Sequence, residues 1–497
     1  MSVDFRPARP PHPLGGLLDH VGTALLIVTA GVVVGLEYIS PNKRVISVLA
    51  AIVMFGVTWR LDMVSGLVVL ILALPFPRGL VFGSTNLAFI LLVLVIWLLR
   101  VSQGQCAPPR RSPLDAPLVT LFACYVISFY NIQDAESLRI NFVNFQMMAA
   151  SWLMCYLIAS ALQTRREFER LLGFQAVSVL LVCLVGVFEA THPGQALIPG
   201  WIEFQSTTLP GASIFAYRVG SSFGDYELLC EYCALHVVLI LFLFLRAKSL
   251  LVRTAYAGLL VLVMFVLFTT VTRGGIIALG VGLLYLLWLV RRRLTLVGVT
   301  ITAGAAAAGL IGMNWLVATS THTGNLFERL AGSTVTGLVP DTRAEVWPAA
   351  WNRIFEHPLL GHGPNYSSHS GARIYYWPHS LFLYVANNVG FIGVSVLLWL
   401  LWTLFRITRP TTDDLRHPDS MRGYMIVARV QMVVFLVDEI KVEYLRNETY
   451  AFQIWVMFAL MVAAYQALHA TAAGEPETRA RGHAPQERRP LRGSLTS

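Results

Sequence analysis

The sequence predicts an all-α integral membrane protein with about 12–14 transmembrane helices, because its composition is too apolar for a protein dissolved in water. Of 497 residues, 56% are apolar and 13% are charged, against about 45–50% and about 25% in an average soluble domain. So few charges cannot cover the surface of a soluble chain of this length. An ordinary water-soluble enzyme is therefore excluded.

The apolar residues fall into segments of the length that a membrane helix needs, about 20 residues for about 30 Å of hydrocarbon. The predicted spans are 20–38, 45–60, 62–75, 86–102, 116–132, 141–162, 172–190, 228–246, 254–271, 274–290, 294–317, 379–404, 424–438 and 449–468. A leader over 1–19 precedes them. An Arg-rich, disordered tail is expected over 469–497. The first span lacks a small-residue cleavage site and is interpreted as a retained helix.

Basic residues predict which side of the membrane each loop faces. Lys and Arg concentrate in alternate short loops, which should be cytoplasmic, and they include Arg110, Arg165, Arg166, Arg246, Lys248, Arg291, Arg292, Arg293, Arg406 and Arg416. Both termini are then cytoplasmic, and Lys43 and Arg44 violate the pattern. The net charge of +9 is interpreted as topology and not as nucleic-acid binding.

Two long polar connections, 191–227 and 318–378, are left on the outer side between helical blocks 20–190, 228–317 and 379–468. Irregular backbone at membrane depth must be buried in protein or line a watery cavity. We therefore look for function in these two loops.

Three arginines, Arg218, Arg273 and Arg343, lie on the outer side against the positive-inside rule. Arg273 stands in a tight turn before Gly274 and Gly275, which open the next helix. A helix N-terminus presents free N–H groups, glycine permits close approach, and arginine supplies a planar fork for phosphate oxygens. The alternative is a turn whose arginine reaches the interface or pairs with an acid.

The surroundings of the other two arginines leave similar alternatives open. Arg218 precedes a Gly/Ser stretch expected to be flexible, in which Asp225 suits a helix N-cap and Glu227 a first-turn charge. The spacing of apolar residues from Arg343 to Ile354 predicts an amphipathic surface helix with its Trp and Ile residues facing inward. An Arg–Glu pair on an ordinary surface helix would explain the same pattern.

His379 opens a long apolar segment directly after the larger loop. Eleven residues at 100° each place Gly390 on the same stripe of a continuous helix, where a small residue permits close packing. A neutral imidazole suits removal of a proton from a hydroxyl, although a histidine at a helix start is often a cap. Tyr376, Trp377 and Ser380 are candidate sugar or acceptor contacts, or part of an interfacial aromatic belt.

No metal site or cofactor is predicted. The remaining histidines lack paired ligand spacing, and the six cysteines form no disulfide framework. Cys230 and Cys233 form a CxxC within an apolar run without a second pair, which favours helix packing over metal binding or redox chemistry.

Taken together, these motifs resemble the O-antigen ligase and O-antigen polymerase superfamily of bacterial membrane glycosyltransferases. His379-Ser380 with Gly390 and Gly393 beyond matches the family's His signature after a large outer loop. Arg218, Arg273 and Arg343 match its other recurring positions, over about 200–470. Glu227 stands where many members carry Asn, so the resemblance assigns it no direct role.

The resemblance implies metal-independent transfer of a glycan from an undecaprenyl-diphosphate donor to a lipid or glycan acceptor, at the outer face of the membrane. Arg218, Arg273, Arg343, Gly274 and Gly275 would hold the diphosphate, and His379 would activate the acceptor hydroxyl. The implied partners are the donor, the acceptor, membrane lipids and other proteins of envelope polysaccharide assembly, but no nucleic acid.

Two alternatives remain open. A polymerase uses the same donor site as a ligase, and the single dominant late loop favours the ligase. A flippase or other transporter of lipid-linked glycans would need charged residues in the middle of several spans. The one dense charged cluster, which comprises Asp438, Glu439, Lys441, Glu443 and Arg446, is instead expected in an outer loop.

Overall fold

The computed structural model describes residues 56, 59, 63–75, 85–106, 108–195, 197, 217–321, 323, 325–331, 335–336, 339–340, 343, 346–364 and 378–472. The predicted spans 20–38 and most of 45–60, the leader, most of the tail, and the candidate residues Tyr376 and Trp377 lie outside these ranges.

The described chain is almost entirely helical. Its α-helices are α3 (Met63–Ala73), α4 (Thr85–Ser102), α5 (Asp115–Ser128), α6 (Ala135–Ala161), α7 (Arg165–Thr191), α8 (Tyr226–Arg246), α9 (Leu250–Thr269), α10 (Arg273–Leu289), α11 (Leu296–Ser320), α12 (Leu326–Ala331), α13 (Val346–Glu356), α14 (Leu381–Ile407), α15 (Ser420–Asp438) and α16 (Glu448–Ala472). A short antiparallel ribbon joins β1 (Val335–Thr336) to β2 (Val339–Pro340). Single 3₁₀ turns include η2 (Ser221–Phe223), η3 (Arg291–Arg293) and η5 (Tyr444–Arg446).

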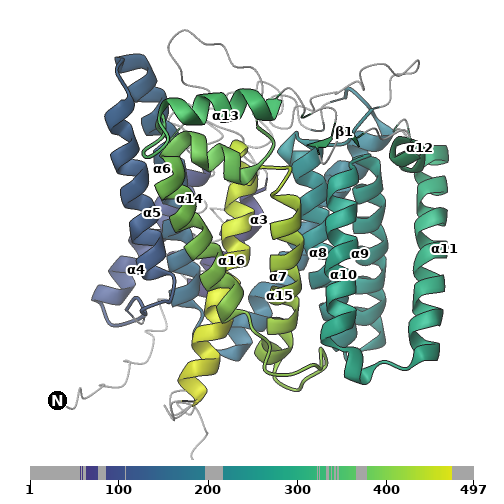
Figure 1. Cartoon of the computed structure of the whole chain (residues 1–497). Coiled ribbons are helices and arrows are strands. Elements are labelled where there is room, and N and C mark those ends of the chain that lie inside the picture. Colours follow the sequence, from purple (N-terminus) through teal and green to yellow (C-terminus); the bar gives the residue numbers. More distant parts are fainter. Residues whose placement is uncertain are drawn as a thin grey trace, which may run out of the picture.

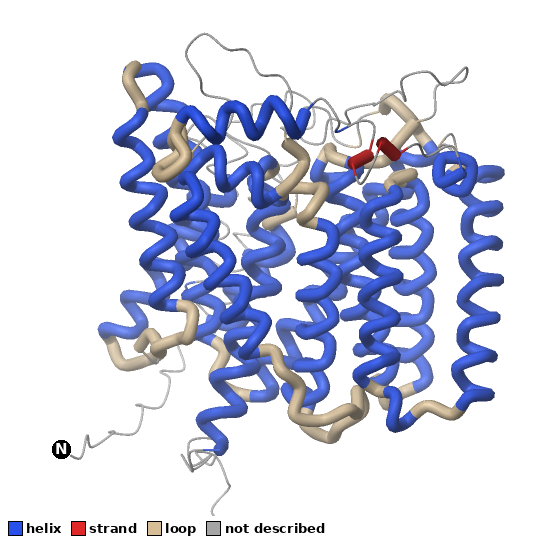
Figure 2. The backbone as a smooth tube through the Cα atoms, in the orientation of Figure 1, coloured by secondary structure: helices blue, strands red, loops and turns tan. Residues whose placement is uncertain are grey.

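The long helices lie side by side as a bundle, as Figures 1 and 2 show. Within the described residues, eight helices are long and apolar enough to cross a membrane: α6, α7, α8, α9, α11, α14, α15 and α16. Shorter apolar helices, α3, α10 and most of α4, complete the set. The predicted polytopic all-α fold is therefore confirmed, and α16 continues to Ala472, four residues beyond its predicted end.

The central helices are packed inside the bundle, whereas α11 stands at its edge. α8 and α16 are buried over most of their length, and the side chains of Tyr232, Tyr450 and Trp455 are almost inaccessible. On α11, Leu296, Ile311 and Trp315 are each more than 60% exposed. In a bilayer these exposed apolar faces would contact lipid.

α13 lies across the upper end of the bundle (Figure 1) and confirms the expected amphipathic helix in the large outer loop. Ala350 and Ile354 pack against Leu383 and Ala386 of α14. Trp351 is 41% exposed, with its ring 6.3 Å from that of Phe391 on α14.

α14 is broken at Gly390, which has φ 69° and ψ −174°. A Cβ there would lie 2.2 Å from the Leu359 carbonyl carbon, because the loop after α13 packs directly on the break. In return, the amides of His362 and Gly363 donate to the Asn387 and Asn388 carbonyls at 2.9 and 3.0 Å. The predicted continuous stripe from His379 to Gly390 is therefore wrong. The glycine permits a turn against a loop and not a helix–helix contact.

Candidate active site

The upper ends of several helices meet around one group of charged side chains. α8, α10, α14 and α16 all begin at this end of the bundle. The amide of Leu381, the first residue of α14, donates to the carbonyls of Glu439 and Val442 at 3.0 and 3.1 Å. The start of α14 is thereby fixed on the turn between α15 and α16. Four positive helix ends at one place favour an anion there.

His379 lies just before α14 and is held by its neighbours in the chain. Its φ of 47° is unusual for a residue with a side chain. The carbonyl of the preceding Pro378 accepts a hydrogen bond from Trp347 Nε1 at 2.9 Å. The following Ser380 is buried and forms the N-cap of α14 without a side-chain capping bond. His379 itself is about one-third exposed, so a substrate can reach it.

Glu227 joins His379 to two arginines. Its Oε2 lies 3.2 Å from His379 Nδ1 and 2.9 Å from Arg446 Nη2. Its Oε1 lies 3.4 Å from Arg343 Nη2. Arg343 Nη2 also donates to the Lys441 carbonyl at 2.9 Å. Two of the predicted site residues, His379 and Arg343, therefore contact the two oxygens of one carboxylate.

Arg446 is surrounded by acids. Its Nη2 lies 2.9 Å from Asp225 Oδ1, and its Nη1 lies 3.3 Å from Glu443 Oε1 and 3.0 Å from His379 Nδ1. Burial disfavours the charged guanidinium, but Asp225, Glu227 and Glu443 raise the pKa of Arg446 well above its usual range. Burial raises the pKa of Glu443 to about 7, although Arg446 opposes this shift. A guanidinium held by fixed carboxylates is a rigid part of the site.

Arg273 begins α10, next to a second cationic group. This group is the ammonium of Lys441. Burial lowers the pKa of Lys441, and the positive charges of Arg343 and Arg273 lower it further, whereas the carboxylate of Asp438 raises it. Several positive charges thus lie within electrostatic range of one another beside a helix N-terminus. Such an arrangement favours an incoming anion.

Gly274 and Gly275 make close packing possible at the start of α10. A Cβ on Gly274 would lie 3.0 Å from Asp438 Oδ1 and 3.4 Å from Lys441 Nζ. A Cβ on Gly275 would lie 2.6 Å from Cys230 Sγ on α8. The space that a side chain at Gly275 would occupy is therefore filled by Cys230 of α8 and not left open for a ligand. Cys230 and Cys233 are both free and buried in the bundle.

Arg218 is buried behind the turn that carries Arg273. Its Nε donates to the Thr270 carbonyl at 3.0 Å and its Nη2 to Thr272 Oγ1 at 2.8 Å. The guanidinium carbon lies 3.2 Å from the centroid of the Tyr226 ring. These contacts stabilise the turn between α9 and α10.

The segment after Arg218 is not the flexible Gly/Ser stretch that the sequence suggested. Ser221, Ser222 and Phe223 form the buried turn η2, and Glu189 accepts the amides of Gly220 and Ser221 at 3.1 and 2.6 Å. A buried carboxylate on α7, distant in sequence, orders the loop. Asp225 caps α8 as expected, accepting from the amides of Glu227 and Leu228.

Sequence reasoning missed Glu227, Lys441, Glu443 and Arg446. The charged cluster of 438–446 was expected in an outer loop. It does connect α15 to α16, and its side chains form part of the candidate site. One signal could have found Arg446: it falls on the predicted outer side, against the positive-inside rule, like Arg218, Arg273 and Arg343.

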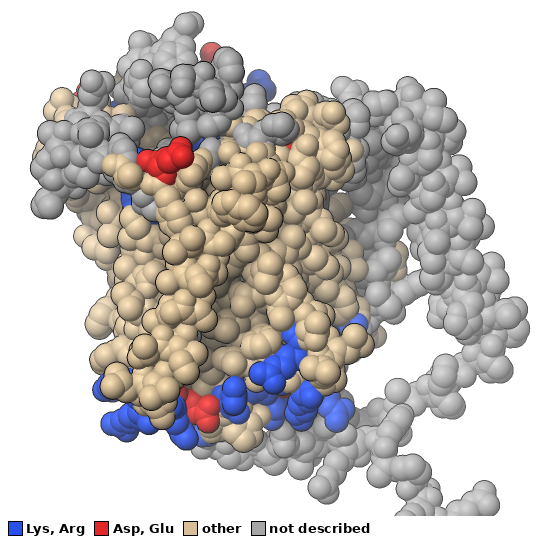
Figure 3. Space-filling view, turned by 90° about the vertical axis from the view of Figure 1, so that its right-hand side faces the viewer, with Lys and Arg blue, Asp and Glu red and all other residues tan. Residues whose placement is uncertain are grey.

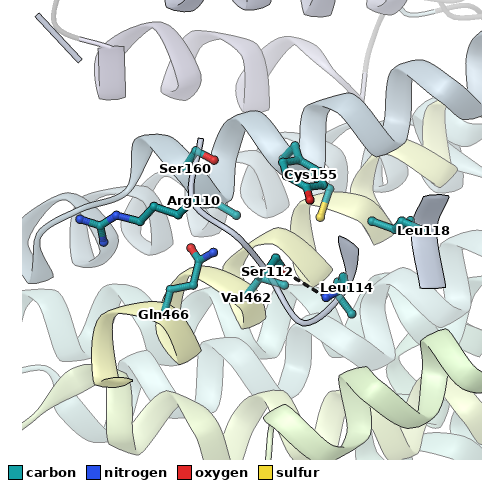
Figure 4. Close-up of a pocket in the computed structure, with 10 residues that line it drawn as sticks. Arg110, Ser112, Leu114, Leu118, Cys155, Ser160, Val462 and Gln466 are labelled. Carbon is teal, nitrogen blue, oxygen red and sulfur yellow. Dashed lines mark hydrogen bonds between the residues drawn. The ribbon is translucent and has the colours of Figure 1, made fainter. Parts of the chain in front are cut away.

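The opposite end of the bundle differs in character. Arg291, Arg292 and Arg293 are exposed in η3, and Figure 3 shows blue basic side chains along the lower edge of this face. A cavity near this end is lined by Arg110, Ser112, Cys155 and Gln466 (Figure 4), and none of the predicted site residues lines it. Within the described residues, no group of three or more His, Cys, Asp and Glu is arranged to hold a metal ion.

Part of the sequence matches a known protein family. Residues 257–398 match the family model described as O-antigen ligase. The matched segment runs from within α9 into α14 and includes Arg273, Arg343 and His379. A comparison with curated proteins gave no match. Over residues 257–398, the chain is thus similar to the O-antigen ligase family.

Proposed function

We propose that this protein transfers a glycan from an undecaprenyl-diphosphate-linked donor to an acceptor hydroxyl, as an O-antigen ligase. The family match supports a glycosyltransferase-type function in O-antigen assembly. The observation that carries the finer proposal is the shared carboxylate of Glu227, which brings His379 and Arg343 together at 3.2 and 3.4 Å. A candidate base and a candidate phosphate ligand therefore lie side by side.

In the proposed reaction, His379 removes the proton of the acceptor hydroxyl as its oxygen attacks the anomeric carbon of the donor sugar. The bond from that carbon to the diphosphate breaks, and undecaprenyl diphosphate leaves with the bonding electrons. A positioned base contributes roughly 10²–10⁴-fold to such a step.

Arg273 and Arg343 are proposed to hold the diphosphate, with the amides of Gly274 and Gly275 at the start of α10. Arg218 supports this group by holding the turn before Arg273. Preorganised positive charge stabilises the negative charge that develops on the leaving group. The arginines can supply this charge, so we propose that transfer does not depend on a divalent metal. Tyr376, Trp377 and Ser380 remain proposed contacts for sugar or acceptor.

We propose that the protein lies in the bacterial plasma membrane, with both termini in the cytoplasm and this site facing the periplasm. Its proposed partners are the lipid-linked donor, a lipid or glycan acceptor, membrane lipids and other proteins of envelope polysaccharide assembly.

The test uses purified wild-type, His379→Ala and His357→Ala proteins in nanodiscs, with lipid-linked donor, a lipid A core as acceptor, and excess chelator. His357 is an exposed histidine near the same outer face and serves as the matched control. We expect His379→Ala to lower the transfer rate roughly 10²–10⁴-fold, and His357→Ala to keep it. An unchanged transfer rate in His379→Ala would contradict the proposal that His379 is the base. A rate that requires added Mg²⁺ contradicts the metal-independent mechanism.

The same assay separates a ligase from a polymerase. A ligase gives no product until a second acceptor, such as a lipid A core, is added. A ladder of longer lipid-linked products from the donor alone would identify a polymerase.

A further inference from the structure

Two opposite partners meet at one nitrogen of His379. Nδ1 lies 3.2 Å from Glu227 Oε2, which can only accept a hydrogen bond, and 3.0 Å from Arg446 Nη1, which can only donate one. A ring nitrogen carries either a proton or a lone pair, so only one of these hydrogen bonds forms at a time. The partner that wins decides which tautomer the ring adopts.

The two tautomers have opposite chemical consequences. If Nδ1 carries the proton and donates to Glu227, Nε2 has a lone pair and can act as a base. If Nδ1 accepts from Arg446, Nε2 carries the proton and cannot accept another. Among the described residues, His379 has hydrogen-bond partners at Nδ1 only, so Nε2 is the nitrogen left for the acceptor.

The surrounding contacts favour the bond to Glu227. Arg446 Nη1 has another acceptor, Glu443 Oε1 at 3.3 Å, and Nη2 is bound by Asp225 and Glu227. Arg446 therefore loses little if Nδ1 is protonated. Moreover, once Nε2 takes a proton, the imidazolium needs an acceptor at Nδ1, and a carboxylate is a charge-assisted one. Glu227 serves the ring before and after proton transfer without movement of any heavy atom.

The backbone also holds Glu227 firmly. It lies in the first turn of α8, where its amide donates to the N-cap Asp225 at 2.9 Å. Its other oxygen, Oε1, is engaged by Arg343. The carboxylate is therefore restrained from both ends, and its side chain is only 14% exposed.

We infer that Glu227 is a positioning residue that holds His379 in the tautomer with its proton on Nδ1, leaving Nε2 as the proton acceptor. This inference rests on the proposed function, in which His379 is the base. The sequence indicated Glu227 only as a favourable charge in the first turn of a helix. The inference gives it a direct role beside His379.

The tautomer can be measured without any substrate. The full-length protein, ¹⁵N- and ¹³C-labelled at histidine, is placed in lipid bilayers at about pH 8.5, where ordinary histidines are neutral. The signal of His379 is the one missing from His379→Gln. Its ¹⁵N and ¹³Cδ2 shifts distinguish the two neutral forms. In the wild type we expect the proton on Nδ1.

The variant Glu227→Gln keeps the shape of the side chain, but its amide can donate to Nδ1. We expect the proton to move to Nε2 and the transfer rate to fall roughly 10²–10⁴-fold. Asp225→Asn is the matched control, because Asp225 binds the same Arg446 nitrogen at the same 2.9 Å. In that control we expect the tautomer to stay on Nδ1.

The outcomes separate this inference from the proposed function. A proton on Nε2 in the wild type overturns the inference even if Glu227→Gln does not fold. A proton that stays on Nδ1 in Glu227→Gln also overturns it. If the tautomer changes as expected while transfer continues at the wild-type rate, Glu227 does position the ring but His379 is not the base.

Discussion

At the scale of single residues, the site is marked by unusual backbone. Among the described residues, the non-glycine residues with positive φ are Ser221, Val271 and His379. The first two lie in the turns beside Arg218 and Arg273, and the third is the proposed base. A β-branched residue such as Val271 rarely adopts this conformation, which persists only where the surrounding structure enforces it. Here the buried turns around η2 and between α9 and α10 enforce it.

Residue types alone indicated part of this site and not the rest. His379, Arg273 and Arg343 were identified because each stands at a predicted loop–helix boundary on the outer side. Glu227 and Glu443 were not, because an acid near a helix start has an ordinary explanation as a dipole partner. Their contacts with Arg446 join residues up to 219 positions apart, and no local pattern encodes such a separation.

Glu443 should make stability depend on pH near neutrality. Burial raises its pKa from the usual 4.5 to about 7. A carboxyl group with a raised pKa binds its proton more tightly in the folded state. Its contribution is therefore full below about pH 4.5 and is lost as the pH rises through 7. Glu443→Gln should remove this dependence, which amounts to at most about 3 kcal/mol in the free energy of unfolding.

The measurement for Glu443 is the melting temperature in nanodiscs at pH 5 and pH 8. The wild type should lose more stability between the two values than Glu443→Gln. An equal loss in both proteins would contradict the assignment of this titration to Glu443.

At the scale of elements, the positions of the helices follow from the apolar runs, but their irregularities do not. Most described helices lie close to their predicted ranges, because each helix satisfies its own backbone within one segment. The helices α6 and α7 begin earlier than predicted, at Ala135 and Arg165 instead of 141 and 172. The break of α14 at Gly390 depends instead on the loop after α13, whose amides satisfy the carbonyls that the break exposes. Gly390 could be recognised as special from the sequence, but its partner could not.

The contact between α10 and α15 depends on one glycine. A Cβ on Gly282 would lie 2.3 Å from Val434 Cγ2, whereas one on Gly280, in the same helix, would meet nothing within 4 Å. We expect Gly282→Ala to destabilise the protein by about 1–3 kcal/mol through overpacking. Gly280→Ala should be neutral or slightly stabilising, because alanine favours helix by up to about 1 kcal/mol over glycine.

A second substitution identifies the cause. Val434→Ala removes the clashing methyl group, so the double variant should be no less stable than Val434→Ala alone. Thermal melting in detergent compares the four proteins with the wild type. If Val434→Ala fails to relieve Gly282→Ala, the clash is not the source of the loss.

At the scale of the whole molecule, the two ends of the bundle carry different charge patterns. The lower end presents exposed arginines, such as those of η3, and the upper end carries paired charges around Glu227 and Arg446. Basic loops are retained in the cytoplasm during insertion. The paired charges of the upper end are explained by contacts within the protein and not by topology.

This asymmetry predicts the orientation. Cysteines introduced at Arg292 in η3 and at Glu356 in α13, both exposed positions, should differ in their reaction with a membrane-impermeant maleimide. Glu356→Cys should be labelled in intact cells, and Arg292→Cys only after permeabilisation, with the unmodified chain as control for its native cysteines. The reverse pattern would place the proposed site in the cytoplasm.

By itself, the sequence determined the membrane class, most of the helical segments, and three residues that the structure places around the candidate site, Arg273, Arg343 and His379. These features are local, since hydropathy and charge act over one helix or loop at a time. Only the tertiary structure decided that α14 breaks at Gly390, that the loop after Arg218 is buried, and that Glu227 and Arg446 meet His379. Those features arise from contacts between helices far apart in the chain, where burial makes each polar group depend on a partner that its own segment does not contain.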